Sequence, residues 1–432
     1  MTVEQWLNND ELAITIWKNK YRFEDESLDD WFKRVSGGNE IVEEQIRAKK
    51  FIFGGRILAN RGLSDKNRKI TYSNCYVVAP PEDNLESIFE CGTKLGGCGI
   101  DISNLRPSGA KVNNAAKTTS GAVSFMDFYS YITGLIGQSG RRGALMISIS
   151  CDHPDLEEFI EIKSDLDKVT KANISVRVSD KFMEAVIKGE TLILKFVTDT
   201  GETITKEVEA YPIFRKLAQM NWDYAEPGIL FWDRITSWNL LSNNKEFSYA
   251  GVNPCAEEPL PAGGSCLLGS INLAEFVTKE RKLDLISLRE TIRVAVIALN
   301  EVLDEGLPLH PLQEQRDSVA EWRQIGLGVM GLADMLIKLR VKYGSATSRS
   351  VLESIGHELI MTALETSSML AANYGPYPKF NRDCVIQTPF FKNLDSGDMN
   401  DLRFQSLHDV ICKYGLRNSQ LLTCAPTGSI AT

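Results

Sequence analysis

The sequence predicts an α/β fold in two regions: a helical region over residues 1–50, and a larger region over 51–432 in which strands alternate with helices. Three observations lead to this prediction. Apolar residues recur at helical spacing near the N-terminus. β-branched and aromatic residues gather in short runs after residue 51, and helical runs lie between those strands. Alternation of this kind fits an α/β barrel, which can exceed the usual size of one domain.

The composition is that of an ordinary globular protein of 432 residues, 43% of them hydrophobic and 24% charged. The net charge of −9 argues against a general nucleic-acid surface, which needs clustered positive charge. No apolar run approaches a membrane span, and residues 1–5 do not resemble a signal peptide. The nine cysteines form neither a compact disulfide framework nor a CxxC metal pattern. We therefore expect a reducing cytoplasm, where a disulfide would be transient and catalytic.

In the first half of the chain, two helices are expected before residue 50, one near 9–17 with a capping candidate and one that opens at Ser27. Residues 69–78 predict a strand with Cys75 near its middle. A helix that starts near residue 120 ends at a glycine-rich loop, 137–143, which glycine makes cheap to rearrange. A strand at 146–150 and a helix opened by Pro154 follow.

In the second half, residues 191–197 and 202–206 predict a β-hairpin, and residues 285–305 and 350–374 predict long helices. Residues 418–423 are expected to form a strand that leads into a turn at 426–429. Consecutive N–H groups in such a turn suit an anionic ligand, although the turn is not a Walker motif. The histidines are scattered without metal-ligand spacing, and none is expected to be catalytic: His153, His310, His357 and His408.

The most informative stretch is NPCAE at residues 253–257, which places a thiol between an amide and a carboxylate. In an extended backbone residues i and i+2 face the same way, so Asn253, Cys255 and Glu257 are expected to project into one space. A thiol, an amide and a proton acceptor in one pocket could form a reaction chamber. Cys266 follows behind a flexible glycine-containing segment and could reach the same chamber. Spacing alone equally allows both cysteines to be buried small hydrophobes, the usual fate of a free cysteine.

This stretch resembles the active-site segment of ribonucleotide reductase large subunits, which convert ribonucleotides to deoxyribonucleotides for DNA synthesis. The likeness runs in register along nearly the whole chain, which makes it far more specific than one pentapeptide. The other matching segments are SNCYV at 73–77, GGCGI at 96–100, LRPSG at 105–109, GQSGRRGA at 137–144, HPDLEEFI at 153–160, EPGI at 226–229, IGLGVMG at 325–331 and APTGSIA at 425–431.

The resemblance implies a ten-stranded α/β barrel over residues 51–432, with the Cys255 loop running through its centre. It also implies roles for the residues named below. It implies no metal ligands. The implied catalytic residues are Cys255, Glu257, Asn253, Cys75 and Cys266. The implied substrate-binding residues are Asn74, Arg142, Pro426, Thr427, Gly428 and Ser429, and the implied effector-binding residues are Asp83, Arg106 and Arg141.

The implied chemistry is radical chemistry on the substrate ribose. A thiyl radical on Cys255 abstracts the 3′-hydrogen, Glu257 acts as base on the 3′-hydroxyl, and Asn253 orients the sugar. The 2′-hydroxyl then leaves as water, and the Cys75/Cys266 dithiol ends as a disulfide. One dithiol releases two electrons on forming a disulfide, the number needed to remove a hydroxyl.

The resemblance is to short members of the family without an N-terminal ATP cone, similar to class II and to phage-type class I enzymes. Control by dNTP or ATP effectors is expected to remain, without on/off control at a cone. The chain is compact and leaves little obvious structure for docking a cobalamin. As the radical source we therefore favour a separate metal-containing subunit over adenosylcobalamin. Relatives continue beyond the position of Thr432, so the barrel's C-terminal segment is expected to be missing or not shown.

The expected partners are a ribonucleotide di- or triphosphate, a nucleotide effector, a thioredoxin-like external dithiol and a second copy of the chain in a homodimer. Neither nucleic acid nor a membrane is expected as a partner. The location is expected to be the cytoplasm, or the host cytoplasm if the gene is phage-borne. The alternative hypothesis is a catalytically inactive nucleotide-binding regulator on the same scaffold.

Overall fold

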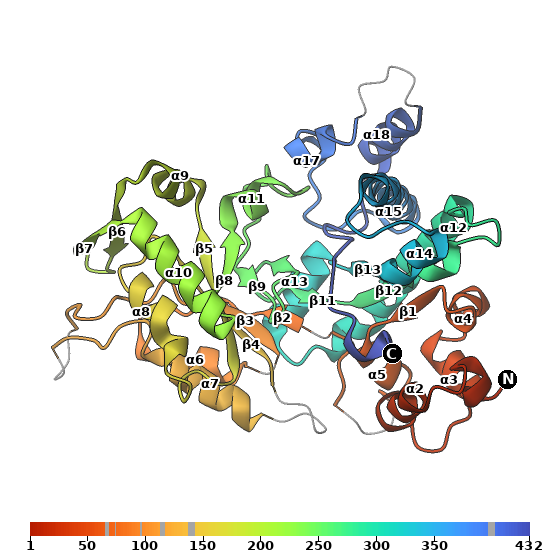
Figure 1. Ribbon diagram of the computed structural model, residues 1–432, viewed down its shortest axis with the longest axis horizontal. Coiled ribbons are helices and arrows are strands. Elements are labelled where there is room, and N and C mark those ends of the chain that lie inside the picture. The colour runs from red at the N-terminus through yellow and green to blue at the C-terminus, as the bar shows by residue number, and fades with distance from the viewer. Residues whose placement is uncertain (65–68, 74, 96, 113–116, 137–142, 396–401) are drawn as a thin grey trace. The chain divides into compact units, whose positions relative to one another are not determined.

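The computed structural model describes residues 1–64, 69–73, 75–95, 97–112, 117–136, 143–395 and 402–432, with only the backbone of Cys266. It divides into two compact units, shown together in Figure 1 and described here one at a time. The sheet unit comprises residues 75–264. The terminal unit comprises residues 1–74 and 265–432.

The sheet unit is built on parallel strands in the order β2-β3-β4-β5-β8. These strands are β2 (Cys75–Val77), β3 (Cys98–Asp101), β4 (Leu145–Ser150), β5 (Ala172–Val178) and β8 (Gly228–Phe231). The crossovers between them contain α6 (Leu85–Thr93), α7 (Phe125–Leu135), α8 (Leu156–Glu161), the short η2 (Ile162–Ser164), α9 (Asp180–Lys188) and α10 (Ala210–Tyr224). The class predicted from the sequence, mixed α/β, is confirmed.

Successive residues of β4 point to opposite faces of this sheet, as the pleat requires. Leu145, Ile147 and Ile149 join one apolar core with residues of α6 to α10, so these helices cover one face. Met146 and Ser148 lie on the other face, and both are buried as well. That second face, called the loop face below, is the one that carries the candidate site.

Two further predictions for the sheet unit had different outcomes. The hairpin of β6 (Thr191–Val197) and β7 (Thr203–Glu209) confirms the predicted hairpin, with Val197 paired to Thr203. The strand predicted over 69–78 is shorter, because only β2 pairs with a neighbour among the described residues. The unit ends with α11 (Trp232–Ser237), β9 (Gly251–Val252) and β10 (Pro259–Leu260).

The terminal unit begins with helices whose starts follow ordinary capping chemistry. Asp10 accepts a hydrogen bond from the Ala13 amide, and Ser27 accepts one from the Asp30 amide. Both predicted helices are thereby confirmed. The elements up to residue 60 are α1 (Val3–Trp6), α2 (Glu11–Ile16), η1 (Trp17–Tyr21), α3 (Leu28–Val35), α4 (Glu40–Arg47), β1 (Phe51–Phe53) and α5 (Gly55–Asn60).

The rest of this unit packs helices around the small sheet β1-β12-β13, in which β12 pairs antiparallel with β1 and parallel with β13. Both predicted long helices are present as α12 and α15. The elements are β11 (Ser265–Cys266), β12 (Leu268–Asn272), η3 (Leu273–Phe276), α12 (Leu285–Gly306), η4 (Leu307–Leu309), α13 (Gln313–Trp322), β13 (Gly326–Met330), α14 (Leu332–Leu339), α15 (Ala346–Tyr374), α16 (Arg382–Ile386), α17 (Pro389–Lys392), α18 (Leu402–Tyr414) and η5 (Gly428–Ile430).

The strand predicted at 418–423 forms only a single parallel bridge, between Leu422 and Leu327 of β13. The pairings of the described strands do not by themselves close a ten-stranded barrel, so closure stays a prediction, as does the boundary at residue 50. Within the described ranges, no helix is long and apolar enough to cross a membrane.

A buried charge network joins α12, α15 and α18. Glu358 is 4% exposed and accepts hydrogen bonds from Arg289 (2.7 and 2.9 Å), from Arg403 (2.8 and 3.1 Å) and from the Thr362 hydroxyl (2.7 Å). Burial would raise the pKa of this carboxyl, but the three donors together lower its pKa from 4.5 to about 2. The carboxylate therefore stabilises the fold above pH 4.5, and this contribution is lost as the pH falls toward 2.

We expect Glu358→Gln to lower the free energy of unfolding at pH 7 by about 2 kcal/mol, because the change removes a buried carboxylate that pairs with two partly exposed guanidinium groups, of which Arg403 keeps Glu365 as a partner. The difference from the unchanged protein should shrink below pH 4.5, as measured by urea unfolding at several pH values. Glu290→Gln, which removes an exposed partner of Arg293, is the control and should change stability by less than about 0.5 kcal/mol. Equal effects of the two changes would contradict this account.

Candidate active site

The candidate site is a tight loop between β9 and β10, which pair antiparallel. Asn253 closes this loop. Its amide donates to the Glu258 carbonyl (3.1 Å), and its side-chain oxygen accepts from the Glu258 amide (3.0 Å). The Asn253 carbonyl also accepts from the Ala256 amide (2.9 Å). Asn253 is completely buried, so its first role is to fix the shape of the loop that presents Cys255.

The sequence-based picture of residues 253–257 as an extended segment was wrong. The segment is a turn, and Ala256 has the left-handed backbone φ of 63°. The turn is favoured because the Asn253 side chain takes the place of a strand partner for the Glu258 amide. Asn253 and Glu257 nevertheless lie near one thiol, that of Cys75, so the turn achieves the grouping that had been expected from alternation.

Contacts from four strands seat the loop on the loop face. Gly99 of β3 lies against Val252, so closely that a Cβ atom at Gly99 would be 1.7 Å from the Val252 carbonyl oxygen. Asn173 of β5 donates its side-chain N–H to the carbonyl of Pro254 (2.9 Å). Met146, Leu230 and Val252 form an apolar cluster, against which Ala256 packs.

Cys75 opens β2 beside this loop and is partly buried. Burial, the charge of Glu257 and the neighbouring Cys255 raise the pKa of Cys75 to about 12, against a weaker opposing effect of Asn253. Burial and the Glu257 charge also raise the pKa of Cys255, although its side chain is exposed. Both groups are therefore thiols at neutral pH. This favours hydrogen-atom chemistry over nucleophilic attack, which requires the thiolate.

Cys266 begins the second segment of the terminal unit, and its side chain lies outside the described part. Its chain neighbours are described. Within the terminal unit, the Ser73 and Ser265 hydroxyl oxygens are 3.2 Å apart. Within the sheet unit, the Val77 amide donates to the Gly264 carbonyl (3.0 Å), and the Gly263 amide donates to the Val77 carbonyl (2.9 Å).

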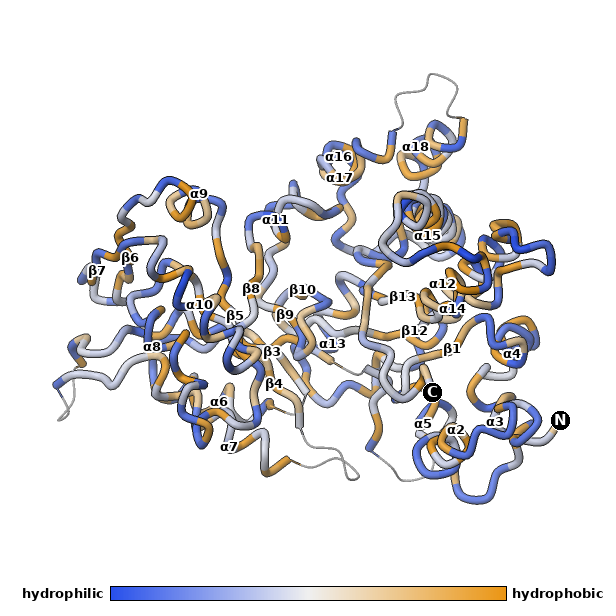
Figure 2. Tube along the Cα trace, viewed as in Figure 1, coloured by the Kyte–Doolittle hydropathy of each residue, from blue (hydrophilic) through white to orange (hydrophobic). Residues whose placement is uncertain are grey.

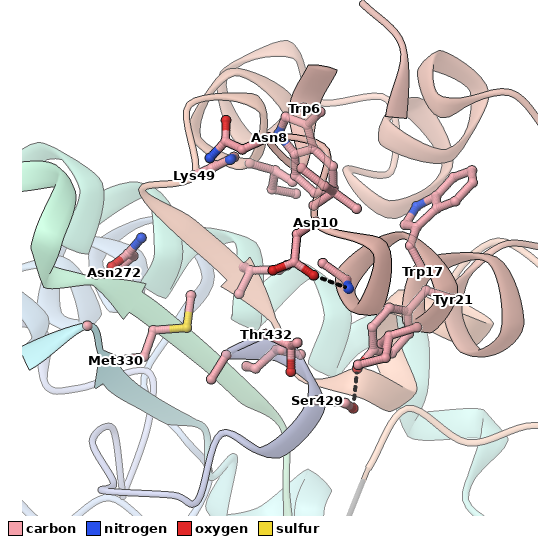
Figure 3. Close-up of a pocket in the computed structure, with 18 of the residues that line it drawn as sticks. Trp6, Asn8, Asp10, Trp17, Tyr21, Lys49, Asn272, Met330, Ser429 and Thr432 are labelled. Carbon is pink, nitrogen blue, oxygen red and sulfur yellow. Dashed lines mark hydrogen bonds between the residues drawn. The ribbon is translucent and has the colours of Figure 1, made fainter. Parts of the chain in front are cut away.

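The predicted phosphate turn lies in the terminal unit. Gly428 has a φ of 59° and starts η5, and Pro426 and Thr427 precede it. The Ser429 hydroxyl is 2.6 Å from that of Tyr21. The end of this turn forms one wall of a cavity of about 380 Å³ lined by aromatic side chains of the N-terminal helices (Figure 3). Three other predicted residues, Asn74, Arg141 and Arg142, lie outside the described residues.

The predicted effector residues Asp83 and Arg106 lie together in the sheet unit. The Asp83 carboxylate accepts from the Arg106 side chain (2.7 Å) and from its amide (3.0 Å). Arg106 also reaches Asp199 at the tip of the β6–β7 hairpin (3.3 Å). The two side chains thus neutralise one another, and their role toward a nucleotide stays a prediction.

Sequence reasoning missed the residues that seat the loop, Gly99 and Asn173. Gly99 stands in a glycine-rich segment, but glycine alone does not show which backbone approaches it. Asn173 gave no signal, because its only distinguishing feature is a contact with Pro254, 81 residues away. Among the residues that the structure describes, no group of three or more His, Cys, Asp or Glu could hold a metal ion.

The fold and the site define an α/β domain in which a loop carrying a protonated thiol is seated on the buried face of a parallel sheet. The chain belongs to the ribonucleotide reductase family, since the family model described as ribonucleotide reductase, barrel domain, matches residues 73–432. The resemblance drawn from the sequence motifs is confirmed.

Three curated relatives illustrate the similarity. The vitamin B12-dependent ribonucleoside-diphosphate reductase of Thermoplasma acidophilum is 35% identical over 80% of this chain and 45% of its own length. The enzyme of the same name from Mycobacterium tuberculosis is 31% identical over 83% and 48%. The ribonucleoside-diphosphate reductase large chain of Cryptosporidium parvum is 28% identical over 83% and 49%. The chain spans about half the length of the curated relatives it matches.

These names correct one expectation. Compactness had favoured a separate metal-containing subunit as the radical source, but the Thermoplasma, Mycobacterium and Streptomyces relatives are all named vitamin B12-dependent. Compactness was a poor guide, because relatives named vitamin B12-dependent match this chain over 80–83% of its length.

Proposed function

We propose that this chain carries the catalytic barrel of a ribonucleotide reductase, which reduces ribonucleotides to 2′-deoxyribonucleotides by thiyl-radical chemistry at Cys255. The observation that carries the proposal is the grouping of two protonated thiols, Cys75 and Cys255, with Glu257 and Asn253 on one seated loop. The inactive-regulator alternative has no observation in its favour, because these four groups are all retained.

In the proposed reaction each group has one task. The Cys255 thiyl takes the 3′-hydrogen of the ribose while Glu257 accepts the proton of the 3′-hydroxyl. The 2′-hydroxyl leaves as water with a proton from the Cys75/Cys266 dithiol. The second hydrogen of the dithiol goes to C2′, and the two sulfurs join as a disulfide, so that two electrons pass to the sugar. Cys255 then returns a hydrogen atom to C3′, and Glu257 returns the proton to the 3′-oxygen. An external, thioredoxin-like dithiol reduces the disulfide again.

The pairing of Cys75 with Cys266 is supported by the chain on either side of the two residues. Ser73 and Ser265 are in contact on one side, and Val77 exchanges hydrogen bonds with residues 263 and 264 on the other.

We infer that adenosylcobalamin supplies the one-electron chemistry that generates the thiyl, as the names of several relatives indicate. Among the residues of this chain, Cys255 is the one whose properties fit an adenosylcobalamin radical generator. Its thiol is protonated and exposed, so a radical generator can approach it from outside the fold.

The test is an assay for deoxynucleotide with the purified chain, a ribonucleoside diphosphate, a dithiol reductant and adenosylcobalamin. We expect product only when adenosylcobalamin is present, and none with cyanocobalamin, which lacks the adenosyl group. Diphosphates are assayed first because the Thermoplasma and Mycobacterium relatives are named for them, and triphosphates are assayed in parallel. A chain that binds nucleotide but forms no product with adenosylcobalamin would contradict the proposal.

The remaining substrate and effector assignments follow the same proposal. The turn from Pro426 to Ser429 holds the substrate phosphates with backbone N–H groups, with Asn74 and Arg142 as further substrate contacts. Asp83 and Arg106 hold the effector, with Arg141 reporting its identity. Arg106 would have to exchange its contact with Asp199 for a phosphate, which a cationic guanidinium favours.

A homodimer is part of the proposal, and one surface of the sheet unit supports it. Leu85 and Phe89 of α6 and Tyr131 and Leu135 of α7 are each more than half exposed. Each pair is spaced i, i+4, so each helix presents one apolar stripe, and a T-shaped Phe89–Phe128 contact joins the helices. Figure 2 shows hydrophobic positions on both helices. Contiguous exposed apolar surface of this kind marks association sites.

We expect Phe89→Glu to weaken association by at least about tenfold, because it buries a charge in the apolar interface. Sedimentation velocity over a concentration series measures the change. Ile187→Glu, at a still more exposed apolar position of α9, is the control and should leave association unchanged. A chain that is monomeric at all concentrations, or equal effects of the two changes, would contradict this interface.

A further inference from the structure

A second row of polar side chains crosses the loop face. On β3 this row lies two residues after Gly99, which seats the Cys255 loop. Gly99 and Asp101 are two residues apart on β3, so they share a face. Asp101 is 2% exposed, and its carboxylate accepts from the Ser148 hydroxyl of β4 (2.6 Å). The Arg177 Nε of β5 is 3.1 Å from the same carboxylate. The sheet therefore holds a charge pair on the face that carries the loop.

The guanidinium of Arg177 makes a second contact with its flat side. It lies 4.5 Å from the ring centre of Trp232, at the start of α11. Trp232 packs against the apolar cluster of Met146, Leu230 and Val252. Ala256, the residue after Cys255, packs against that same cluster. A continuous series of contacts thus runs from Asp101 through Arg177 and Trp232 to the apolar cluster. That cluster contacts the Cys255 loop both before and after Cys255, at Val252 and at Ala256.

We propose that Arg177 is a positioning residue for Cys255: Asp101 fixes its guanidinium, the guanidinium fixes Trp232, and Trp232 holds the apolar cluster that supports the loop. The proposal rests on the proposed function for the meaning of a well-placed Cys255. It goes beyond that function because neither the motifs nor the catalytic roles assign any task to Asp101, Arg177 or Trp232.

Two properties of the pair favour positioning over simple stabilisation. Replacing a buried ion pair by apolar residues is often neutral for stability, so stability alone gives weak reason for a charge pair on this face. Arginine also suits the task better than lysine. Its planar group can pair with a carboxylate through the N–H groups at its edge while an aromatic ring lies on its face, whereas an ammonium group cannot keep both geometries.

The experiment compares Arg177→Ala, Trp232→Ala and the double variant, with Arg47→Ala as the control. Arg47 also lies between carboxylates and an aromatic ring, in the N-terminal helices, with Asp29 and Glu43 each at 2.7 Å and the Phe32 ring at 4.2 Å. Two quantities are measured in the full chain. One is the rate of maleimide labelling of Cys255 relative to Cys424, another exposed cysteine, by peptide mass spectrometry. The other is kcat and KM for ribonucleotide reduction.

We expect Arg177→Ala to raise the relative labelling rate of Cys255 by at least about threefold, because a loosened loop lets the thiol move away from the Glu257 charge, which lowers its pKa. We expect kcat to fall by about 10- to 100-fold while KM stays within about twofold, because a small misplacement of a reacting group acts on the chemical step. Trp232→Ala should reproduce both effects, and the double variant should add little, since the residues act in series. Arg47→Ala should change neither quantity.

The labelling readout does not depend on reductase activity, so the positioning role is tested even if the proposed function fails. An unchanged labelling ratio in Arg177→Ala, or fully additive effects in the double variant, would overturn the proposal. If Arg177→Ala does not fold, the same labelling experiment compares Arg177→Lys with Trp232→Phe instead. The lysine variant should then shift the labelling ratio while the phenylalanine variant, which keeps an aromatic face, should not, and the opposite order would overturn the proposal.

Discussion

Replacing Cys255 by serine is expected to lower the rate of ribonucleotide reduction by more than about three orders of magnitude, with nucleotide binding unchanged. An S–H bond is weak enough for a thiyl to form and to be restored in each turnover, whereas a serine O–H bond is not. The side chain is exposed at the tip of a turn that Asn253 closes through its own groups. The substitution therefore removes the reacting atom and leaves the loop in place.

The measurement pairs an activity assay with equilibrium binding of a ribonucleotide to the same preparation. Cys384→Ser, at a partly buried cysteine of α16, is the matched control and should keep full activity. Activity retained in Cys255→Ser would refute the radical assignment. Loss of binding together with activity would show that the residue acts in substrate recognition.

The grouping of Asn253, Cys255 and Glu257 could be predicted from their spacing, but the conformation that produces the grouping could not. Alternation along a strand was the simplest way to make three side chains converge. The chain uses a turn with Ala256 in a left-handed conformation. Asn253 closes that turn, and Asn173 holds its Pro254 carbonyl through a contact across 81 residues that leaves no trace in local sequence.

The fold shows the same division between local and distant causes. Helices that depend on a cap at Asp10 or Ser27 were predicted because the cap and the helix are adjacent in sequence. The segment predicted as a strand at 418–423 shares three backbone hydrogen bonds with residues 325 and 327, but only its Leu422 forms a bridge, with Leu327 of β13. Propensity describes the segment, whereas pairing depends on what lies beside it.

The interactions between charged and titratable side chains could be predicted even less well than the fold. Asp83 and Arg106 were both assigned to an effector nucleotide, yet each is the other's partner, at 2.7 Å. The raised pKa of Cys75 comes from burial and from Glu257, more than 180 residues away in sequence. A sequence shows that such groups exist, but the sign and size of their interaction depend on their distance in the fold.

The second large effect is expected from a residue that has no side chain. A methyl group at Gly99 would lie 1.7 Å from the Val252 carbonyl oxygen, far closer than atoms can approach. The opposing atom belongs to the backbone of β9, so no side-chain rotation can relieve the overlap. The hairpin that carries Cys255 must therefore move away from β3 in Gly99→Ala. Because a misplacement of about 1 Å can cost about 100-fold in rate, we expect kcat to fall by about 100-fold or more.

Gly356→Ala is the matched control, since Gly356 lies within α15 and a Cβ atom there would meet nothing within 4 Å. That change should leave kcat unaltered and stabilise the helix by about 0.5–1 kcal/mol. Steady-state kinetics and thermal unfolding of the two variants separate loop displacement from general damage. If Gly99→Ala keeps full activity, the close seating of the hairpin on β3 is not what places the reacting thiol. If it loses activity at an unchanged unfolding temperature, the loss lies in the position of Cys255 and not in the stability of the sheet.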